Sequence, residues 1–253
     1  MKKLLLPLPT KGFDPTEVAI PWKLLSEAGH DVRLATPSGA PGVVDDRMLN
    51  GTDLGILKPV LRARKDAVDA YREMTEVDAF KSPHAYGDLN EKAFDGLLLP
   101  GGHDKPVREY LESEKIQKLA VDFFAAKKPV GAICHGVVVL ARSIDPATGK
   151  SVLNGYKTTA LLKKQEILAY NMTRLYLGDY YLTYPGKTVE GEVRDALDSQ
   201  SDFIEGPSPL YRDSPNKLKR GFTVRDRNYV SARWPGDAYN FAIAFNKLLS
   251  EAT

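Results

Sequence analysis

A single cysteine stands in a sequence context that favours nucleophilic chemistry. Residues 132–136 read Ala-Ile-Cys-His-Gly, so small residues flank Cys134 two positions before and two positions after it. The sharp strand-to-helix turn called a nucleophile elbow requires such neighbours, because the two backbones pass close together. The turn would place the sulfur at a helix N-terminus, where unpaired N–H groups and the helix dipole favour the thiolate. We therefore expect Cys134 to be a reactive thiol.

The group that exchanges protons with this thiol must come from a short list. The chain has four histidines, His30, His84, His103 and His135, and none follows residue 135. Papain-like proteases, α/β-hydrolases and triad glutamine amidotransferases all need a histidine well downstream of the nucleophile, so none of these triads can form here. The partner is therefore the adjacent His135, an upstream histidine, or a carboxylate. Glu17, one turn into the first predicted helix, is the carboxylate we favour.

A Pro-Gly-Gly sequence ends another predicted strand. Gly101 and Gly102 leave their backbone N–H groups open to approach, and with the amide of His135 they are suited to stabilising an oxyanion. The next residue, His103, is either a pocket residue or a surface residue. His84 and His103 lack the i, i+4 spacing of paired zinc ligands, so the sequence predicts no metal site.

Strands that alternate with helices must position these residues. The alternation implies an α/β fold whose mostly parallel sheet is covered on both faces, a three-layer sandwich. Because ligands of such sheets bind at the carboxyl ends of the strands, Glu17 and Cys134 should meet there. The predicted strands cover residues 4–8, 31–35, 94–99, 129–133, 221–225 and 229–233, and the predicted helices cover residues 16–28, 107–126, 137–141 and 236–249.

Residues 40–93 interrupt this alternation. They combine a turn-rich stretch, a helical pattern over residues 58–74 and a Ser-Pro-His loop, which we interpret as a small cap-type insertion over the site. The chain has no repeat and no convincing linker, so we expect residues 1–253 to form one domain. A later helix near residues 161–171 precedes a tyrosine-rich segment, residues 176–184, which either lines a pocket or packs at a surface or dimer contact.

Composition excludes several classes of partner. The 253 residues carry 35 basic and 33 acidic side chains, so the net charge of +2 gives no field for holding nucleic acid or an anionic membrane. No apolar run is long enough to span a bilayer. The lone cysteine fits a reducing compartment, and we expect a cytoplasmic protein. Neither a dinucleotide fingerprint nor a complete phosphate loop is present, so no cofactor is expected.

Four motifs together resemble the ThiJ/PfpI superfamily, which shares the class I glutamine amidotransferase-like, flavodoxin-type fold. They are Gly-Phe-Asp-Pro-Thr-Glu at residues 12–17, Glu-Ala-Gly-His at 27–30, Leu-Leu-Leu-Pro-Gly-Gly-His at 97–103, and Ala-Ile-Cys-His-Gly at 132–136. The Cys-His pair and the cap-sized insertion are most similar to the branch of heat-inducible chaperones and glyoxalase III enzymes.

The resemblance implies roles for particular residues. Glu17 would hydrogen-bond the Cys134 sulfur, His135 would be a second catalytic member, and Gly102 would line the oxyanion site. A carboxylate beyond the cysteine orients the histidine in that branch, and Glu166 is the position that could align with it. The resemblance also implies a homodimer.

We therefore hypothesise a cofactor-independent conversion of a small 2-oxoaldehyde, such as methylglyoxal, to a 2-hydroxy acid, in the manner of glyoxalase III or D-lactate dehydratase. A thiolate nucleophile beside proton-transfer groups is the chemistry that this reaction needs. Two alternatives stay open. One is a cysteine hydrolase acting as an amidase, peptidase or isonitrile hydratase, and the other is a stress-related holdase chaperone.

Overall fold

The centre of the molecule is a sheet of seven strands in the order β10-β11-β7-β6-β1-β3-β5, seen in a computed structural model that describes residues 1–252. All neighbours are parallel except β10, which pairs antiparallel with β11 at one edge. The strands are β1 (Lys3–Pro7), β3 (Asp31–Thr36), β5 (His84–Ala85), β6 (Gly96–Leu99), β7 (Val130–Ile133), β10 (Thr223–Asp226) and β11 (Tyr229–Ala232).

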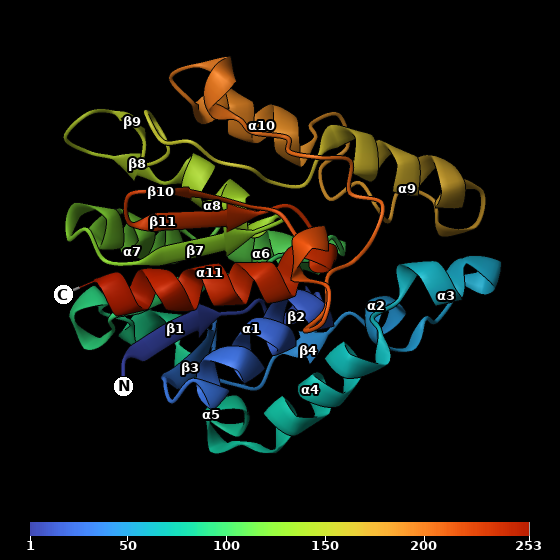
Figure 1. Cartoon of the computed structure of the whole chain (residues 1–253), viewed down its shortest axis with the longest axis horizontal. Helices are drawn as coiled ribbons and strands as arrows, with labels where there is room; N and C mark the ends of the chain where they lie inside the picture. Colours follow the sequence, from blue (N-terminus) through green and yellow to red (C-terminus); the bar gives the residue numbers. More distant parts are fainter. Residues whose placement is uncertain (253) are drawn as a thin grey trace.

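Helices cover both faces of this sheet, which confirms the predicted three-layer α/β fold. One face carries α1 (Pro15–Glu27) and α11 (Ala238–Glu251), and the other carries α6 (Arg108–Leu111), α7 (Glu114–Ala125) and α8 (Gly136–Arg142) (Figure 1). Strands β6, β7 and β11 are buried along their whole length, because each contributes side chains to both layers of core. The two buried apolar clusters lie on opposite faces of the sheet.

The first helix begins as the sequence predicts. The Asp14 side chain accepts hydrogen bonds from the backbone N–H groups of Thr16 and Glu17, and Pro15 occupies the first turn. Gly29, with a φ of +84°, follows the last residues of the helix. The Asp14 cap holds the first turn of α1, and with it Glu17, at the carboxyl end of β1.

Two predicted helices are each divided in the structure. The pattern over residues 58–74 forms α3 (Lys58–Leu61) and α4 (Lys65–Glu76), because the backbone N–H of Ala63 donates to the carbonyl of Met48, 2.7 Å away, instead of continuing the helix. The pattern over residues 107–126 forms α6 and α7, because Ser113 caps a new helix with its side chain.

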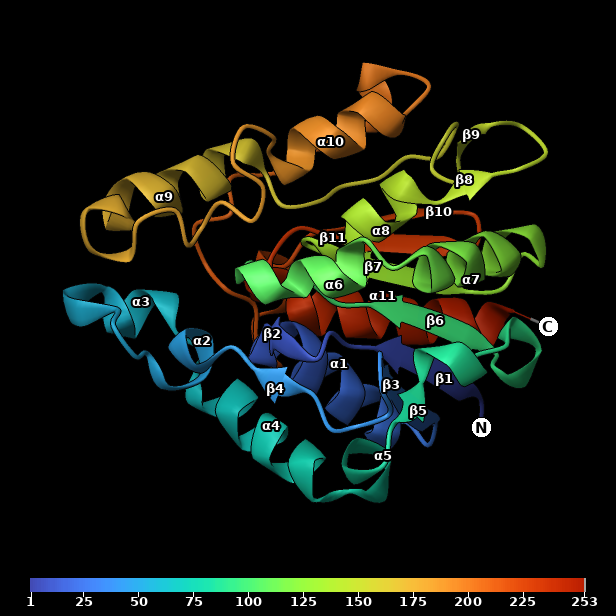
Figure 2. The ribbon, with the colours of Figure 1, turned by 180° about the vertical axis from the view of Figure 1, so that it is seen from behind.

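The insertion extends the helical layer and reaches beyond the sheet. Helix α4 packs its buried face against α1. The remaining pieces are β4 (Val43–Val44), which pairs with β2 (Lys11–Phe13), α2 (Asp46–Asn50), a 3-10 turn at Gly55–Leu57, and α5 (Asp78–Lys81). Figures 1 and 2 both place α2 and α3 beyond the carboxyl ends of the strands.

A second segment reaches the same end of the molecule from the other layer. The hairpin β8 (Ile144–Asp145) and β9 (Lys150–Ser151) leads to α9 (Lys163–Leu177) and α10 (Val189–Ala196). In Figure 2, α9 lies above α3 at the carboxyl edge of the sheet. Met48 and Leu54 of the insertion form a small buried cluster with Tyr180 and Tyr181, so two distant segments of the chain close over this edge together.

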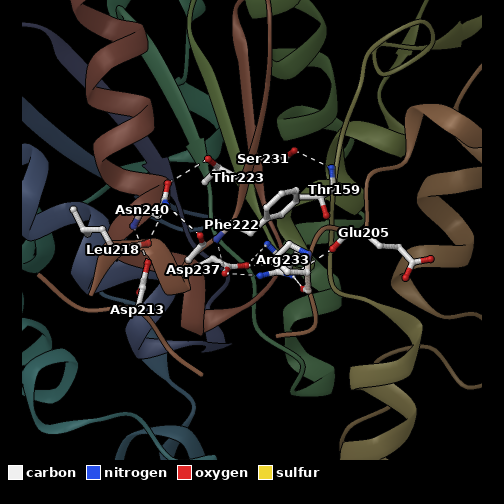
Figure 3. Close-up of polar contacts among 12 residues, drawn as sticks. Thr159, Glu205, Asp213, Leu218, Phe222, Thr223, Ser231, Arg233, Asp237 and Asn240 are labelled. Carbon is white, nitrogen blue, oxygen red and sulfur yellow. Dashed lines mark hydrogen bonds and ion pairs between the residues drawn. The ribbon is translucent and has the colours of Figure 1, made fainter. Parts of the chain in front are cut away.

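A buried ion pair anchors the end of the sheet nearest the elbow. Arg233 follows β11 and is fully buried, and its guanidinium donates to both carboxylate oxygens of Asp237 at 2.8 and 3.0 Å (Figure 3). The same Asp237 accepts the backbone N–H of Phe222 at 2.9 Å, while Arg233 also donates to the carbonyl of Glu205. Because the buried charges are paired and hydrogen-bonded, they hold the returning chain against β11.

No helix among residues 1–252 combines the length and apolar character needed to cross a membrane.

Candidate active site

Cys134 sits at the tip of a sharp turn between β7 and α8. Its φ is +58°, a left-handed value that is uncommon for any residue except glycine. The turn closes against neighbouring backbone, because a Cβ at Gly136 would collide with the carbonyl of Leu99 and the Cys134 amide donates to the carbonyl of Ala232 at 3.0 Å. The structure therefore has the geometry of a nucleophile elbow, with the small flanking residues that this geometry requires.

The surroundings of the Cys134 sulfur favour the neutral thiol, whereas the sequence led us to expect a thiolate. Only 4% of the residue is exposed, and burial raises the pKa of the thiol well above its ordinary value. The neighbouring Glu17 and Asp14 carboxyls raise the pKa further, whereas the backbone N–H of His135 lowers it. Helix-terminal amides favour the thiolate, but desolvation outweighs them here.

His135 is the direct partner of the thiol. Its Nδ1 lies 3.4 Å from the Cys134 sulfur, and its Nε2 lies 2.9 Å from the hydroxyl oxygen of Thr183. The ring is fully buried, and burial lowers the pKa of His135 to about 3, with the positive charges of His103 and Arg142 contributing. The imidazole is therefore neutral at physiological pH and able to accept a proton.

Glu17 reaches the same point from the first turn of α1. One oxygen, Oε2, accepts the backbone N–H of Gly101 at 2.9 Å. Burial raises the pKa of Glu17 well above its ordinary value, and the Asp14 carboxylate adds to the rise. These surroundings favour the protonated carboxyl, and because Oε2 accepts an N–H, its proton would lie on Oε1. That oxygen makes no hydrogen bond of standard geometry, but its carboxyl interacts with the Cys134 thiol.

The two glycines after β6 do different things. A Cβ at Gly101 would lie 2.6 Å from the Glu17 carboxyl and 2.8 Å from the backbone nitrogen of His135, so only glycine lets these groups meet. Its amide is already donated to Glu17 and is not free for an oxyanion. Gly102 has a φ of +150°, and within residues 1–252 its amide donates to no acceptor. Of the two glycine amides expected as oxyanion donors, the structure thus leaves only that of Gly102 open, and the third expected donor, the amide of His135, lies against the Cys134 sulfur.

His103 lies beside the site and is only partly exposed. Its ring stacks on Tyr181 with centroids 4.5 Å apart and meets Tyr180 edge-on at 4.8 Å. Burial lowers the pKa of His103 to about 4, and its Nε2 has no hydrogen-bond partner among the described residues. The Tyr180 hydroxyl donates to Asp45 of the insertion. Part of the tyrosine-rich segment therefore covers the site.

Glu166 does not contact His135. It lies in the first turn of α9, where its Oε2 accepts the backbone N–H of Val189, at the start of α10, at 3.0 Å. Burial raises the pKa of Glu166 to about 7. In the structure Thr183 lies beside His135, and no local sequence pattern indicates this contact. The tyrosine run next to Thr183 was the only signal in this region.

No group of three or more His, Cys, Asp or Glu side chains within residues 1–252 is arranged to hold a metal ion. A cavity of about 380 Å³ lies between α9 and α10, lined by residues including Lys163, Tyr184 and Thr188, but none of the residues grouped around Cys134 lines it.

Fold and site together define an α/β protein with a buried elbow cysteine, an adjacent histidine and a glutamic acid on the first helix. A family model described as ThiJ/PfpI family-like matches residues 8–207. The chain belongs to this family, which confirms the resemblance seen in the sequence motifs.

Relatives in this family are distant. An uncharacterised protein of Schizosaccharomyces pombe is 30% identical over 141 residues, which cover 55% of this chain and half of that protein. The glutathione-independent glyoxalase hsp3101 of the same yeast is 28% identical over 205 residues, covering 79% of this chain and 75% of its own length. The crystal structure of glyoxalase III from Candida albicans superimposes with a TM-score of 0.69 over 98% of this chain and 97% of that one, at 20% identity. The structural likeness shows the shared fold.

Proposed function

We propose that this chain is a cofactor-independent enzyme of the glyoxalase type, which converts methylglyoxal-like 2-oxoaldehydes to 2-hydroxy acids with Cys134 as nucleophile. The observation that carries the proposal is the placement of the Cys134 sulfur 3.4 Å from the neutral His135 Nδ1, beside the protonated Glu17. A nucleophile with two proton-transfer groups is what the reaction requires. The name of the glutathione-independent glyoxalase relative supports the same chemistry.

The first step forms a carbon–sulfur bond. His135 Nδ1 takes the thiol proton as the sulfur adds to the aldehyde carbon of the substrate, and then passes it to the aldehyde oxygen, which becomes the hydroxyl of a hemithioacetal. The amide of Gly102, which has no acceptor among residues 1–252, would stabilise the developing negative charge on that oxygen. Because the thiol is neutral at rest, attack and proton transfer occur together.

The second step moves a proton between carbons. His135, again neutral, acts as the base and removes the hydrogen from the former aldehyde carbon, while the protonated Glu17 donates to the neighbouring carbonyl oxygen, which gives an enediol. The reverse transfers, from His135 to the neighbouring carbon and from the hydroxyl of the former aldehyde carbon to Glu17, give a thioester of the 2-hydroxy acid. Water then cleaves the thioester, which releases the acid and regenerates the thiol. The sum of these steps is the addition of one water to the 2-oxoaldehyde, and no external oxidant or reductant is needed.

The test compares the parent protein with Cys134→Ala. We expect the parent to consume methylglyoxal and release lactate, and the variant to lose this activity because the carbon–sulfur bond cannot form. Circular dichroism checks that the variant keeps its fold. Lactate formation by the variant at the parent rate would contradict the proposal.

The same pair of proteins separates the alternatives. Peptide or amide turnover by the parent, lost on thiol alkylation and without any lactate formation, would favour the cysteine hydrolase. Suppression of client aggregation by Cys134→Ala as well as by the parent, again without lactate formation, would favour the holdase.

A further inference from the structure

The direction of one hydrogen bond defines the state of the site histidine. The Thr183 hydroxyl lies 2.8 Å from the carbonyl oxygen of His103 and 2.9 Å from Nε2 of His135. A hydroxyl has one proton to donate, and a carbonyl can only accept. The Thr183 proton therefore goes to the His103 carbonyl, and the hydroxyl oxygen accepts the N–H of His135.

This assignment places the proton of the neutral imidazole on Nε2. Nδ1 then carries the free lone pair, and Nδ1 is the atom that faces the Cys134 sulfur at 3.4 Å. With the opposite tautomer, Nδ1–H would point at the thiol and could not take its proton. The Thr183 hydroxyl keeps its hydrogen bond to Nε2–H after Nδ1 is protonated. It therefore orients the ring both before and after the proton transfer.

The backbone around Thr183 is held firmly in place. Its side chain is almost fully buried, and its carbonyl accepts two N–H groups of the Arg108 guanidinium, one of them at 2.7 Å. A few residues earlier, Asp179 pairs with Lys105 at 2.5 Å. Residues 179–183, which lie over the site, are thus tied to residues 105–108, which closely follow β6 and His103.

We propose that Thr183 is a positioning residue that selects the Nε2–H tautomer of His135 and so makes Nδ1 the base for Cys134. The proposal deepens the proposed function and rests on it for its catalytic consequence. A neutral hydroxyl supplies the orientation that a carboxylate supplies in other cysteine–histidine sites, without adding a negative charge that would hold the imidazole protonated.

Three variants test the catalytic consequence. Thr183→Val keeps the shape of the side chain but removes the hydroxyl, and we expect kcat for methylglyoxal to fall by about 10- to 100-fold with KM changed little, by analogy with the loss of the hydrogen-bond partner that orients a metal-bound histidine. Thr183→Ser restores the hydroxyl and should recover most of the activity. Thr173→Val is the matched control, because Thr173 is also buried and its hydroxyl bonds only to the carbonyl of Ala169.

A spectroscopic readout separates this proposal from the proposed function. Nitrogen NMR of histidine-labelled parent protein should show His135 as the Nε2–H tautomer, and Thr183→Val should shift it toward a mixture. An Nδ1–H tautomer in the parent would overturn the proposal even if methylglyoxal is the substrate. Equal kcat and equal spectra for the parent and Thr183→Val would overturn it as well. An Nε2–H tautomer in a parent protein that does not act on methylglyoxal would support the positioning role and contradict only the proposed function.

Discussion

At the scale of single residues, the site depends on three protonation states that burial sets. Burial favours the protonated forms of Cys134 and Glu17 and the neutral form of His135, because each charged form would lose its hydration inside the protein. The thiol is therefore unreactive until a substrate carbonyl is in place and His135 accepts the proton. Such a site protects the thiol from the oxidation that threatens an exposed thiolate.

Gly101 offers a test at this scale. Gly101→Ala would place a Cβ 2.6 Å from the Glu17 carboxyl and 2.8 Å from the backbone nitrogen of His135, so Glu17 or the elbow must move. We expect a loss of about 1–3 kcal/mol in the free energy of unfolding, measured by urea denaturation, together with a large loss of methylglyoxal turnover. The matched control is Gly87→Ala, where a Cβ meets open space. Parent-like stability and turnover in Gly101→Ala would contradict the close approach described here.

At the scale of elements, much of the arrangement could be predicted and some of it could not. The strands, the first helix and the elbow follow from apolar runs, caps and small residues that lie close in sequence. The contact between Thr183 and His135 joins residues 48 positions apart across two layers, and no periodicity reports it. Glu166 illustrates the same limit: spacing made it a candidate partner of His135, but the register of α9 turns it toward Val189.

Glu166 makes a prediction about pH. Its pKa is raised from an ordinary 4.5 to about 7 in the fold, so its contribution to stability is fully present below pH 4.5 and is lost as the pH rises toward and through 7, because the unfolded chain releases this proton before the folded chain does. Glu166→Gln keeps an acceptor for the Val189 amide. Its free energy of unfolding, relative to the parent, should therefore rise between pH 5 and pH 8.5, and methylglyoxal turnover should persist.

Denaturation at several pH values measures this effect. Glu114→Gln, at an exposed first-turn position of α7, is the control and should leave the pH dependence unchanged. If the stability of Glu166→Gln had the same pH dependence as that of the parent, Glu166 would not be a buried carboxyl with a raised pKa. If Glu166→Gln lost methylglyoxal turnover, Glu166 would be part of the catalytic site after all.

At the scale of the whole molecule, two segments far apart in sequence close over one sheet edge. Met48 and Leu54 of the insertion pack against Tyr180 and Tyr181, and the result is an enclosed sulfur and not an open crevice. The sequence predicts that the insertion lies near the site, but the enclosure itself depends on packing between both segments. The homodimer implied by the family resemblance stays a prediction, which the molar mass in solution would check.

The central claim is that Cys134 bonds to the substrate during turnover. The most direct measurement is a single-turnover experiment with enzyme in excess over methylglyoxal, quenched with acid at successive times and analysed by peptide mass mapping. We expect the peptide containing Cys134 to gain the mass of the substrate before lactate appears, and to lose it as lactate is released. Lactate formation while that peptide stays unmodified in every quenched sample would contradict the account.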